Sequence, residues 1–477
     1  MLQKDNIPVV SEMLAADPER ARDFSRSHGG WALDFSRLPL TREAFSELRQ
    51  VPRSLGLAQA VARLFGAGIV NPSENQPALH MALRAAEPFP GLDAGAASDV
   101  IDARERFLAV AGQLHAGRTG LTDILHVGIG GSDLGPRLVA DALDADDSAV
   151  RVHWLSTLDA RYFERLCRRL DPATTGLVIA SKSFSTEETL LQARAARDWL
   201  GLDWASRCWA ATANIERARE FGLDDAHILP FAGWTGGRFS LWSSVGVSAA
   251  AAIGPERFRA LLAGAESADT DFHQHPDADG FATLLGLLVH YLRRGLDCNT
   301  LGVVSYEPRL ALLADYLQQL IMESLGKGVD LDGQAVDGPT APLIFGGRGT
   351  DLQHSIFQAL HQGPDTHPLI LVGSRDADHD HPDWQRRQLA HLLAQAEALA
   401  NGREDGESFQ RMPGNRPVMT LLVDRLNAGK LGWLLASLEH AVYALSVIWR
   451  INAFDQWGVE EGKRLAAEIR RRLEEGE

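Results

Sequence analysis

The chain has 477 residues, of which 45% are hydrophobic and 23% charged, and its formal net charge is −16. The length predicts about two or three domains, and the composition is typical of a folded globular protein. The acidic charge argues against nucleic acid or an anionic membrane as the main partner. An anionic substrate would need local cations and hydrogen-bond donors, because the overall field repels it.

The N-terminal residues and the cysteines indicate in which cellular compartment the protein functions. The first 20 residues carry acidic side chains and no long apolar run, so we expect no signal peptide. No uninterrupted apolar run reaches roughly 18 residues, so we expect no transmembrane helix. Cys167, Cys208 and Cys298 are odd in number and far apart. They predict free thiols in a reducing cytoplasm, with no disulfide framework and no zinc site.

The first half of the chain changes from helices to alternating strands and helices. Residues 1 to about 115 predict mostly helices with short loops, such as Asn71–Pro77. Beyond them, short apolar runs alternate with helical patterns such as 187–200. Such alternation predicts parallel βαβ units in a doubly wound sheet. The predicted strands lie within 124–130, 150–156, 176–183, 207–213 and 227–231.

A second alternating half follows a polar stretch at 254–279, which we interpret as a boundary. Its predicted helices are 280–295, a long amphipathic one over 308–328 with Gly326 at its C-terminus, 431–451 and 459–477. Its predicted strands are 299–306, 367–374 and 416–424. The expected fold is α/β, with two αβα sandwich domains on parallel sheets. We expect a helical region at 1–115, α/β domains at 116–265 and 280–450, and a C-terminal segment at 451–477.

The turn after the first of these strands is rich in glycine, over Val127–Pro136. Asp133 stands where a dinucleotide-binding fingerprint needs its third glycine, which weakens a nucleotide interpretation. Glycines between a strand and a helix still expose backbone N–H groups that suit a phosphate or a sugar hydroxyl. On this segment alone, a simple tight turn explains the glycines equally well.

A hydroxyl-rich loop at Ser181–Thr189 follows the strand predicted within 176–183. A helix cap requires one hydroxyl, whereas Ser181, Ser183, Ser185 and Thr186 surround Lys182 here. A phosphate has several oxygens that accept hydrogen bonds, so the surplus of donors favours a phosphate site.

Two further segments carry charged residues at positions where a role in catalysis can be considered. Arg238 follows two glycines in Gly236–Ala250, where it is either a surface residue or a donor to a developing oxyanion. Glu323 lies near the end of the long predicted helix with Gln319 one turn earlier on the same face. A solvent-exposed glutamate at a helix end is the alternative.

The histidines do not form a metal-binding pattern. His354 and His361 are seven residues apart on a helix predicted over 348–363, without ligands at zinc spacing. The run Asp376–Asp383 is interpreted as a solvated acidic loop. No metal site is therefore predicted.

The segment Asp455–Lys463, DQWGVEEGK, offers Gln456 and Lys463. Polar residues of this kind usually lie on the surface without a further role. Together with the four segments above, they complete a set of groups suited to a sugar phosphate.

Two of these segments, GGRFSLWSSVGVSAA (Gly236–Ala250) and FDQWGVEEGK (Phe454–Lys463), resemble signature stretches of the glucose-6-phosphate isomerase family. The resemblance extends from about Asn71 to the end of the chain. It implies two sugar-isomerase (SIS) domains and a cytoplasmic homodimer without metal or organic cofactor. It also implies an enzyme of glycolysis and gluconeogenesis that interconverts glucose 6-phosphate and fructose 6-phosphate by ring opening and a cis-enediolate.

The resemblance further implies a role for each matching residue. Glu323 matches the proton-transfer base, and Arg238 the arginine that stabilises the intermediate. Lys463 matches a lysine that assists ring opening, and His354 a ring-opening histidine that enters the site from the partner subunit. The residues that match substrate contacts are Gln319, Gln456, Gly131, Ser132, Ser181, Lys182, Ser183 and Thr186.

The chain departs from the family pattern at two places. It has ESLGK where the family has ESNGK, so Leu325 replaces an asparagine. It has GGRGTDLQH where the family has GEPGTNGQH, which changes Gly347, Arg348, Asp351 and Leu352. Two alternatives stay open: a non-catalytic regulator that binds a sugar phosphate, and an isomerase of another phosphosugar such as mannose 6-phosphate.

Overall fold

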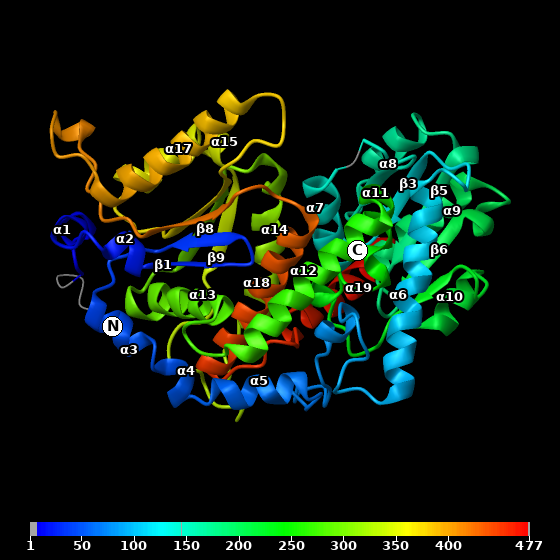
Figure 1. The fold of residues 1–477 in the computed structure, drawn as a ribbon. Coiled ribbons are helices and arrows are strands. Elements are labelled where there is room, and N and C mark those ends of the chain that lie inside the picture. The colour runs from blue at the N-terminus through cyan, green and yellow to red at the C-terminus, as the bar shows by residue number, and fades with distance from the viewer. Residues whose placement is uncertain (1–6, 145, 476–477) are drawn as a thin grey trace.

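The computed structural model describes residues 7–144 and 146–475. Two β-sheets with flanking helices lie side by side, and the long helices α12 and α18 run between them (Figure 1). The α/β class with parallel sheets predicted from the sequence is confirmed. The strands are β1 (Ser25–His28), β2 (Trp31–Asp34), β3 (Asp123–Val127), β4 (Arg151–Leu155), β5 (Thr175–Ala180), β6 (Cys208–Thr212), β7 (Ile228–Pro230), β8 (Thr300–Ser305), β9 (Leu343–Arg348), β10 (Leu369–Ser374) and β11 (Val418–Val423).

Helices cover both sheets. The α-helices are α1 (Val10–Ala16), α2 (Arg20–Asp23), α3 (Arg42–Leu48), α4 (Val51–Ser54), α5 (Leu57–Phe65), α6 (Ala94–His115), α7 (Leu134–Ala142), α8 (Ala160–Cys167), α9 (Glu187–Leu200), α10 (Ile215–Phe221), α11 (Val247–Ile253), α12 (Pro255–Gln274), α13 (Phe281–His290), α14 (Leu313–Leu317), α15 (Gly349–Gln353), α16 (Phe357–Gln362), α17 (Pro382–Asn401), α18 (Ala428–Trp449) and α19 (Glu460–Glu475). Short 3₁₀ turns η3 (Gly130–Ser132), η6 (Gly237–Phe239) and η12 (Trp457–Val459) and the π-helical turn η10 (Gln318–Glu323) carry residues of the candidate site.

The first sheet is parallel throughout, with the strand order β4-β3-β5-β6-β7. β3, β5 and β6 are buried along their whole length, which is why they are continuous apolar runs in the sequence. The chain passes from β3 to β4 on one side and then to β5 on the other. Ligands of open parallel sheets bind at the carboxyl ends of the strands where the order reverses in this way. Here that position holds the glycine-rich turn and the hydroxyl-rich loop.

The second sheet has the order β1-β2-β11-β10-β8-β9. β8 to β11 are parallel, and the N-terminal hairpin β1–β2 pairs antiparallel with β11. Three strands were missed in the sequence. The prediction of a mostly helical start overlooked the hairpin, because each of its strands has only four residues. β9 was missed because its polar and glycine-containing end, FGGR, hides the apolar pattern.

Two predicted helices and one predicted boundary differ from the structure. The long helix expected over 308–328 is divided into a 3₁₀ turn, α14 and the π-turn η10, and its last helical residue is Leu325. The helix expected over 348–363 is two short helices, α15 and α16, with His354 directly after the first. The polar stretch interpreted as a boundary is largely helical, because α12 continues to Gln274.

The helix pair α12–α18 packs closely enough to require glycine. A Cβ atom on Gly264 would lie 1.8 Å from the carbonyl oxygen of Gly429, and one on Gly432 would lie 1.9 Å from that of Leu261. α18 is long and apolar enough to cross a membrane. However, 94% of its most apolar stretch is buried inside the protein. Such burial is that of a core helix.

A buried charge cluster ties this helix pair to the N-terminal region. The Arg84 guanidinium donates to Asp269 of α12 (Nε to Oδ2, 2.8 Å) and to Glu439 of α18. His440 donates to Asp269 over 2.7 Å, and Trp242 donates to Glu439 over 2.8 Å. The Arg84 and Glu439 side chains are fully buried. The cluster therefore fixes α12, α18 and the segment that follows η6 in one arrangement.

Removing the cation of this cluster should destabilise the fold strongly. The variant Arg84→Met leaves two buried carboxylates facing each other, which typically costs about 3–5 kcal/mol in the free energy of unfolding. Urea denaturation at a fixed protein concentration measures the loss. The control Arg49→Met breaks the exposed Arg49–Asp279 pair and should cost about 1 kcal/mol or less. Equal losses in the two variants would contradict the importance of the buried cluster.

Candidate active site

One cavity of about 490 Å³ brings together eleven of the twelve residues proposed from the sequence. They come from the carboxyl edge of the first sheet, from η6, from η10 and from the C-terminal segment. The eleven residues are Gly131, Ser132, Ser181, Lys182, Ser183, Thr186, Arg238, Gln319, Glu323, Gln456 and Lys463. The twelfth, His354, is exposed and does not line the cavity.

The glycine-rich turn η3 is in direct contact with η6. A Cβ atom on Gly131 would lie 1.9 Å from the carbonyl oxygen of Gly237, so this position accepts only glycine. The neighbouring Ser132 is held from behind by the buried His126 of β3, whose Nε2 donates to the Ser132 carbonyl over 2.7 Å. The Ser248 hydroxyl donates to Nδ1 of the same ring over 2.8 Å. These two bonds define the neutral tautomer of His126.

The hydroxyl-rich loop lies between β5 and α9. Thr186 occupies the N-cap position of α9, but its side chain does not make the capping hydrogen bond. It lies instead 3.4 Å from the Ser181 hydroxyl. The buried Phe184 has a left-handed backbone (φ 47°), which is strained for a bulky residue. The loop therefore directs its hydroxyls and the Lys182 ammonium at the cavity and not at the helix end.

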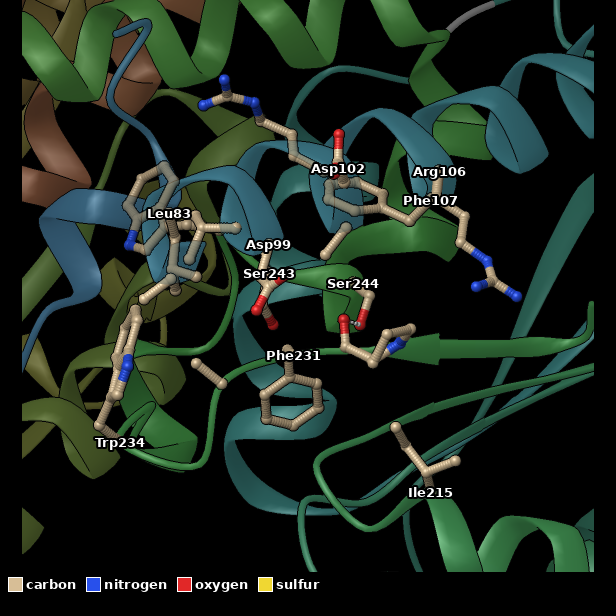
Figure 2. Close-up of a pocket in the computed structure, with 17 residues that line it drawn as sticks. Leu83, Asp99, Asp102, Arg106, Phe107, Ile215, Phe231, Trp234, Ser243 and Ser244 are labelled. Carbon is tan, nitrogen blue, oxygen red and sulfur yellow. Dashed lines mark hydrogen bonds between the residues drawn. The ribbon is translucent and has the colours of Figure 1, made fainter. Parts of the chain in front are cut away.

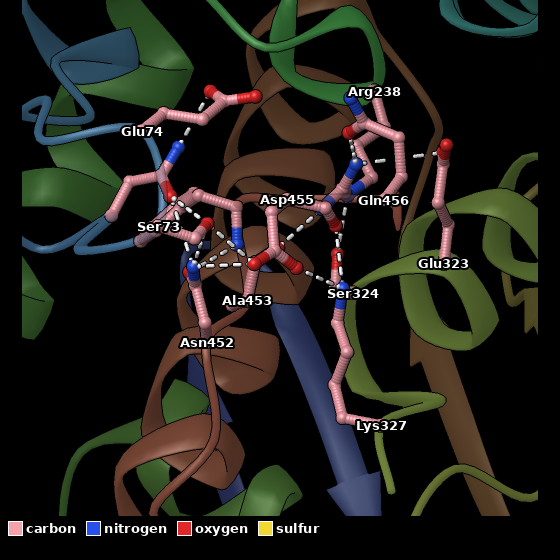
Figure 3. Close-up of polar contacts among 12 residues, drawn as sticks. Ser73, Glu74, Arg238, Glu323, Ser324, Lys327, Asn452, Ala453, Asp455 and Gln456 are labelled. Carbon is pink, nitrogen blue, oxygen red and sulfur yellow. Dashed lines mark hydrogen bonds and ion pairs between the residues drawn. The ribbon is translucent and has the colours of Figure 1, made fainter. Parts of the chain in front are cut away.

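Arg238 is buried and its guanidinium joins three segments of the chain (Figure 3). Nε donates to the Ser324 hydroxyl over 2.6 Å and Nη1 to Gln456 Oε1 over 2.9 Å. Nη2 donates to the backbone carbonyls of Ala453 and Asp455. Burial lowers the pKa of Arg238 from its ordinary value, and the Glu323 carboxylate opposes that shift.

Glu323 lies beside this guanidinium at the end of the π-turn η10. Its Oε2 is 3.5 Å from Arg238 Nη1, and its side chain is 22% exposed. Oε2 is buried and accepts no hydrogen bond from the residues that the structure describes. π-turns are frequent at functional sites, and this one carries both Gln319 and Glu323, which line the cavity. Oε2 thus has its ion pair with Arg238 but no hydrogen bond from these residues.

The C-terminal segment closes the cavity with Gln456 and Lys463. Lys463 lies in the first turn of α19, and its exposed ammonium pairs with Glu460 over 2.7 Å. A surface ion pair of this kind contributes little to stability. Lys463 can therefore exchange that partner for a ligand at little cost.

Sequence reasoning missed the residues that support the site from behind. Ser324 and Lys327 follow Glu323 in the ESLGK stretch, and Asp455 precedes Gln456 in DQWGVEEGK. Their hydrogen bonds to Arg238 and to one another appear in Figure 3. These residues stand inside two motifs that the sequence analysis had already selected, and that position is the signal that could have identified them.

A second cavity, of about 470 Å³, lies between α6 and the segment 230–244 (Figure 2). Its wall is mainly aromatic and aliphatic and includes Phe231 and Trp234, and it is also lined by the charged residues Asp99, Asp102, Arg104 and Arg106. It contains none of the twelve proposed residues. Neither cavity contains a group of three His, Cys, Asp or Glu side chains placed to hold a metal ion, and neither does the rest of the described chain.

Comparison with known proteins identifies the family. A family model described as phosphoglucose isomerase matches residues 34–477. The glucose-6-phosphate isomerase of Xanthomonas axonopodis pv. citri (strain 306) is 44% identical over 462 residues, which cover 96% of this chain and 91% of that protein. The chain belongs to the phosphoglucose isomerase family. This confirms the resemblance seen in the signature stretches and the enzyme class that it implied, an aldose–ketose isomerase.

Solved structures agree with the family assignment. A glucose-6-phosphate isomerase from Chlamydia trachomatis D/UW-3/Cx has a TM-score of 0.89 at 28% identity and covers 98% of this chain and 94% of that one. A hypothetical protein from Thermus thermophilus has a TM-score of 0.70 at 27% identity and covers 92% of this chain and 99% of that one.

The departures from the phosphoglucose isomerase pattern lie outside the cavity. Leu325 is fully buried in the hydrophobic core and does not line the site. Gly347, Arg348, Asp351 and Leu352 do not line it either. The set of groups that faces a ligand within one subunit is therefore unaffected by these substitutions.

The buried His126 should make stability depend on pH. Burial lowers its pKa to about 4, whereas the unfolded chain takes up this proton near its ordinary value of about 6.5. The unfolded state therefore binds more protons between these values, and stability falls as pH drops from about 6.5 to about 4.

The variant His126→Gln should show a shallower loss of stability over that pH range. The glutamine keeps a donor for the Ser132 carbonyl but does not titrate. Thermal unfolding followed from pH 7 to pH 4 measures the slope, and His391→Gln, which replaces an exposed histidine of α17, is the control. A slope in His126→Gln as steep as in the parent would show that this histidine does not set the pH dependence.

Proposed function

We propose that this protein interconverts glucose 6-phosphate and fructose 6-phosphate in glycolysis and gluconeogenesis. The observation that carries the proposal is the gathering of a carboxylate, a buried guanidinium, two lysines and a hydroxyl-rich loop in one cavity of a phosphoglucose isomerase family member. Aldose–ketose isomerisation requires ring opening, proton transfer between C2 and C1, and stabilisation of an anionic enediolate. Each requirement has a group of matching chemistry in the cavity.

The hydroxyl-rich loop would bind the phosphate. Ser181, Ser183 and Thr186 offer hydroxyl donors and Lys182 a cation, and Gly131 and Ser132 would contact the sugar from the neighbouring turn. Charge-assisted hydrogen bonds are the stronger ones, so a few of them suffice in a protein whose net charge is −16. Binding energy from the non-reacting phosphate can then position C1 and C2.

Glu323 would transfer the proton. A general base must reach the proton that it removes; Glu323 lines the cavity together with Gln319, and its Oε2 accepts no hydrogen bond from the described residues. Arg238 would stabilise the enediolate, because its guanidinium lies 3.5 Å from that carboxylate and is already fixed in place. Gln319 and Gln456 would contact the sugar hydroxyls.

Ring opening would use Lys463 and His354 as the acid–base pair. We propose that His354 acts in the site of a partner subunit, in a homodimer. It is exposed and lies outside its own cavity. An adjoining cavity of about 740 Å³ shares Glu323 and Gln456 with the site, and its apolar lining includes the exposed Leu331 and Trp457. An apolar, exposed surface beside an incomplete site suits a second copy of the chain.

The free cysteines support a cytoplasmic location. Cys167, Cys208 and Cys298 are unpaired, as expected of a reducing compartment. Neither alternative function is favoured. A non-catalytic regulator has no use for Glu323 beside Arg238, and mannose 6-phosphate enters the assay below as a competing substrate.

The purified protein should convert fructose 6-phosphate to glucose 6-phosphate in the presence of EDTA. It should convert mannose 6-phosphate more slowly or not at all. The variant Glu323→Gln should lose about 10²–10⁴-fold in kcat, the usual contribution of a general base. A dehydrogenase-coupled assay measures both. Asp315→Asn, an exposed carboxylate of the preceding helix outside the cavity, is the matched control and should keep full activity. Parent-like activity of Glu323→Gln would rule out this base.

The shared site can be tested by mixing two inactive variants. Glu323→Gln and His354→Gln are each expected to be inactive, because every site of either homodimer lacks one group. In mixed dimers one of the two sites is intact, so random pairing restores about a quarter of the parent activity. Co-expression with two affinity tags gives the mixed dimer. Absence of any recovery in isolated mixed dimers would place His354 outside the partner's site.

A further inference from the structure

The carboxylate of Asp455 is a buried meeting point of three segments behind the cavity (Figure 3). Its Oδ1 accepts a hydrogen bond from Lys327 Nζ over 2.6 Å. Its Oδ2 accepts from the Ser73 hydroxyl over 2.6 Å and from Asn452 Nδ2 over 2.8 Å. Lys327 follows the π-turn that carries Glu323, Ser73 lies in the N-terminal turn 71–77, and Asn452 follows α18. One side chain thus joins parts of the chain that are far apart in sequence.

The main chain beside this carboxylate is also held by hydrogen bonds. The carbonyl oxygen of Asp455 accepts from Arg238 Nη2 over 3.2 Å and from Lys327. The side chain of the next residue, Gln456, accepts from Arg238 Nη1 over 2.9 Å. Asp455 therefore determines where the Gln456 side chain enters the cavity and which oxygen atoms accept hydrogen bonds from Arg238.

The charges around Glu323 are balanced by the same residue. Arg238 and Lys327 are two buried or part-buried cations, and Glu323 and Asp455 are the two carboxylates that face them. Burial acts to raise the pKa of Asp455, but the hydrogen bonds from Lys327 and Ser73 outweigh it, and the net shift is downward. Asp455 is thus ionised at neutral pH and keeps Lys327 engaged. Glu323 is the other carboxylate whose charge acts on the Lys327 ammonium.

We propose that Asp455 is a positioning residue of the isomerisation, which holds Lys327 away from Glu323 and aligns Arg238 and Gln456 with the reacting carbons. The inference rests on the proposed function of the cavity. Asp455 lines the adjoining cavity of about 740 Å³ but not the cavity that holds the proposed site residues, so it acts on that site through its neighbours. Its removal should affect the transition state more than the bound sugar, since misplacement of catalytic groups by about 1 Å costs on the order of 10² in rate.

The test is the variant Asp455→Asn, which keeps the shape of the side chain and removes its charge. Its kcat for fructose 6-phosphate should fall about 10- to 100-fold, with KM changed less than about threefold. Two ligands distinguish an effect on the bound sugar from an effect on the transition state. Glucitol 6-phosphate, which cannot isomerise, should bind as tightly as to the parent. A phosphorylated hydroxamate, which mimics the planar anionic enediolate, should lose affinity in proportion to kcat.

Two further variants keep the test decisive if Asp455→Asn folds poorly. Ser73→Ala removes one donor to Asp455 and should lower kcat by a few-fold, about 2- to 10-fold. Lys327→Met added to Asp455→Asn should cause little further loss, since residues that act as one unit are not additive. A product of two independent losses in the double variant would overturn the proposal.

The control is Glu307→Gln. Glu307 is a buried carboxylate that accepts from Arg309 over 2.9 Å and from the Ser374 hydroxyl over 2.6 Å, and it does not line the cavity. It should lose thermal stability as Asp455→Asn does and keep the parent's kcat. Parent-like kcat with lowered stability in Asp455→Asn would make Asp455 only a structural link. Equal affinity losses for both probes would contradict selective positioning. A parent without isomerase activity would reject the proposed function, while the two binding probes would still test the positioning.

Discussion

The guanidinium of Arg238 is the interaction on which the candidate site depends. It binds Ser324 beside the proposed base, Gln456 at the cavity wall and two backbone carbonyls of the C-terminal segment. No other group could replace it, because only a guanidinium offers five N–H donors in a fixed plane. Three segments from distant parts of the chain are thus held around one cation. The same cation is available to an anionic intermediate without further rearrangement.

The rest of the fold maintains this arrangement. The close-packed pair α12–α18 and the cluster of Arg84, Asp269 and Glu439 join the N-terminal region to the core between the two sheets. Trp242, four residues after Arg238, donates to Glu439, so the buried cluster also supports η6. The loops at the carboxyl edge of the first sheet then face the C-terminal segment across the cavity. A chain with net charge −16 can in this way present three cationic side chains, Lys182, Arg238 and Lys463, to one anion.

Much of this was predictable from local sequence. Parallel strands such as β3 and β5 were recognised because strands buried on both faces are continuous apolar runs. The cavity residues were predicted from unusual motifs such as the hydroxyl-rich loop and, for Glu323 and Gln319, from the resemblance to the isomerase family. The hairpin β1–β2 and strand β9 were missed because their stability comes from pairing with distant strands, which leaves little local pattern. The division of the long helix at η10 and the bonds of Asp455 were also missed, since both depend on distant segments of the chain, such as those of Arg238 and Ser73.

The most direct measurement follows the exchange of sugar hydrogen in heavy water. Glucose 6-phosphate incubated with the parent in D₂O should gain deuterium at C2, because a base that removes this proton exchanges it with solvent before returning it. Proton magnetic resonance of the recovered sugar detects the change. Steady incorporation is expected with the parent, and almost none with Glu323→Gln. Isomerisation that leaves C2 free of deuterium after prolonged incubation, or undiminished exchange in the variant, would contradict proton transfer by Glu323 through an enediolate.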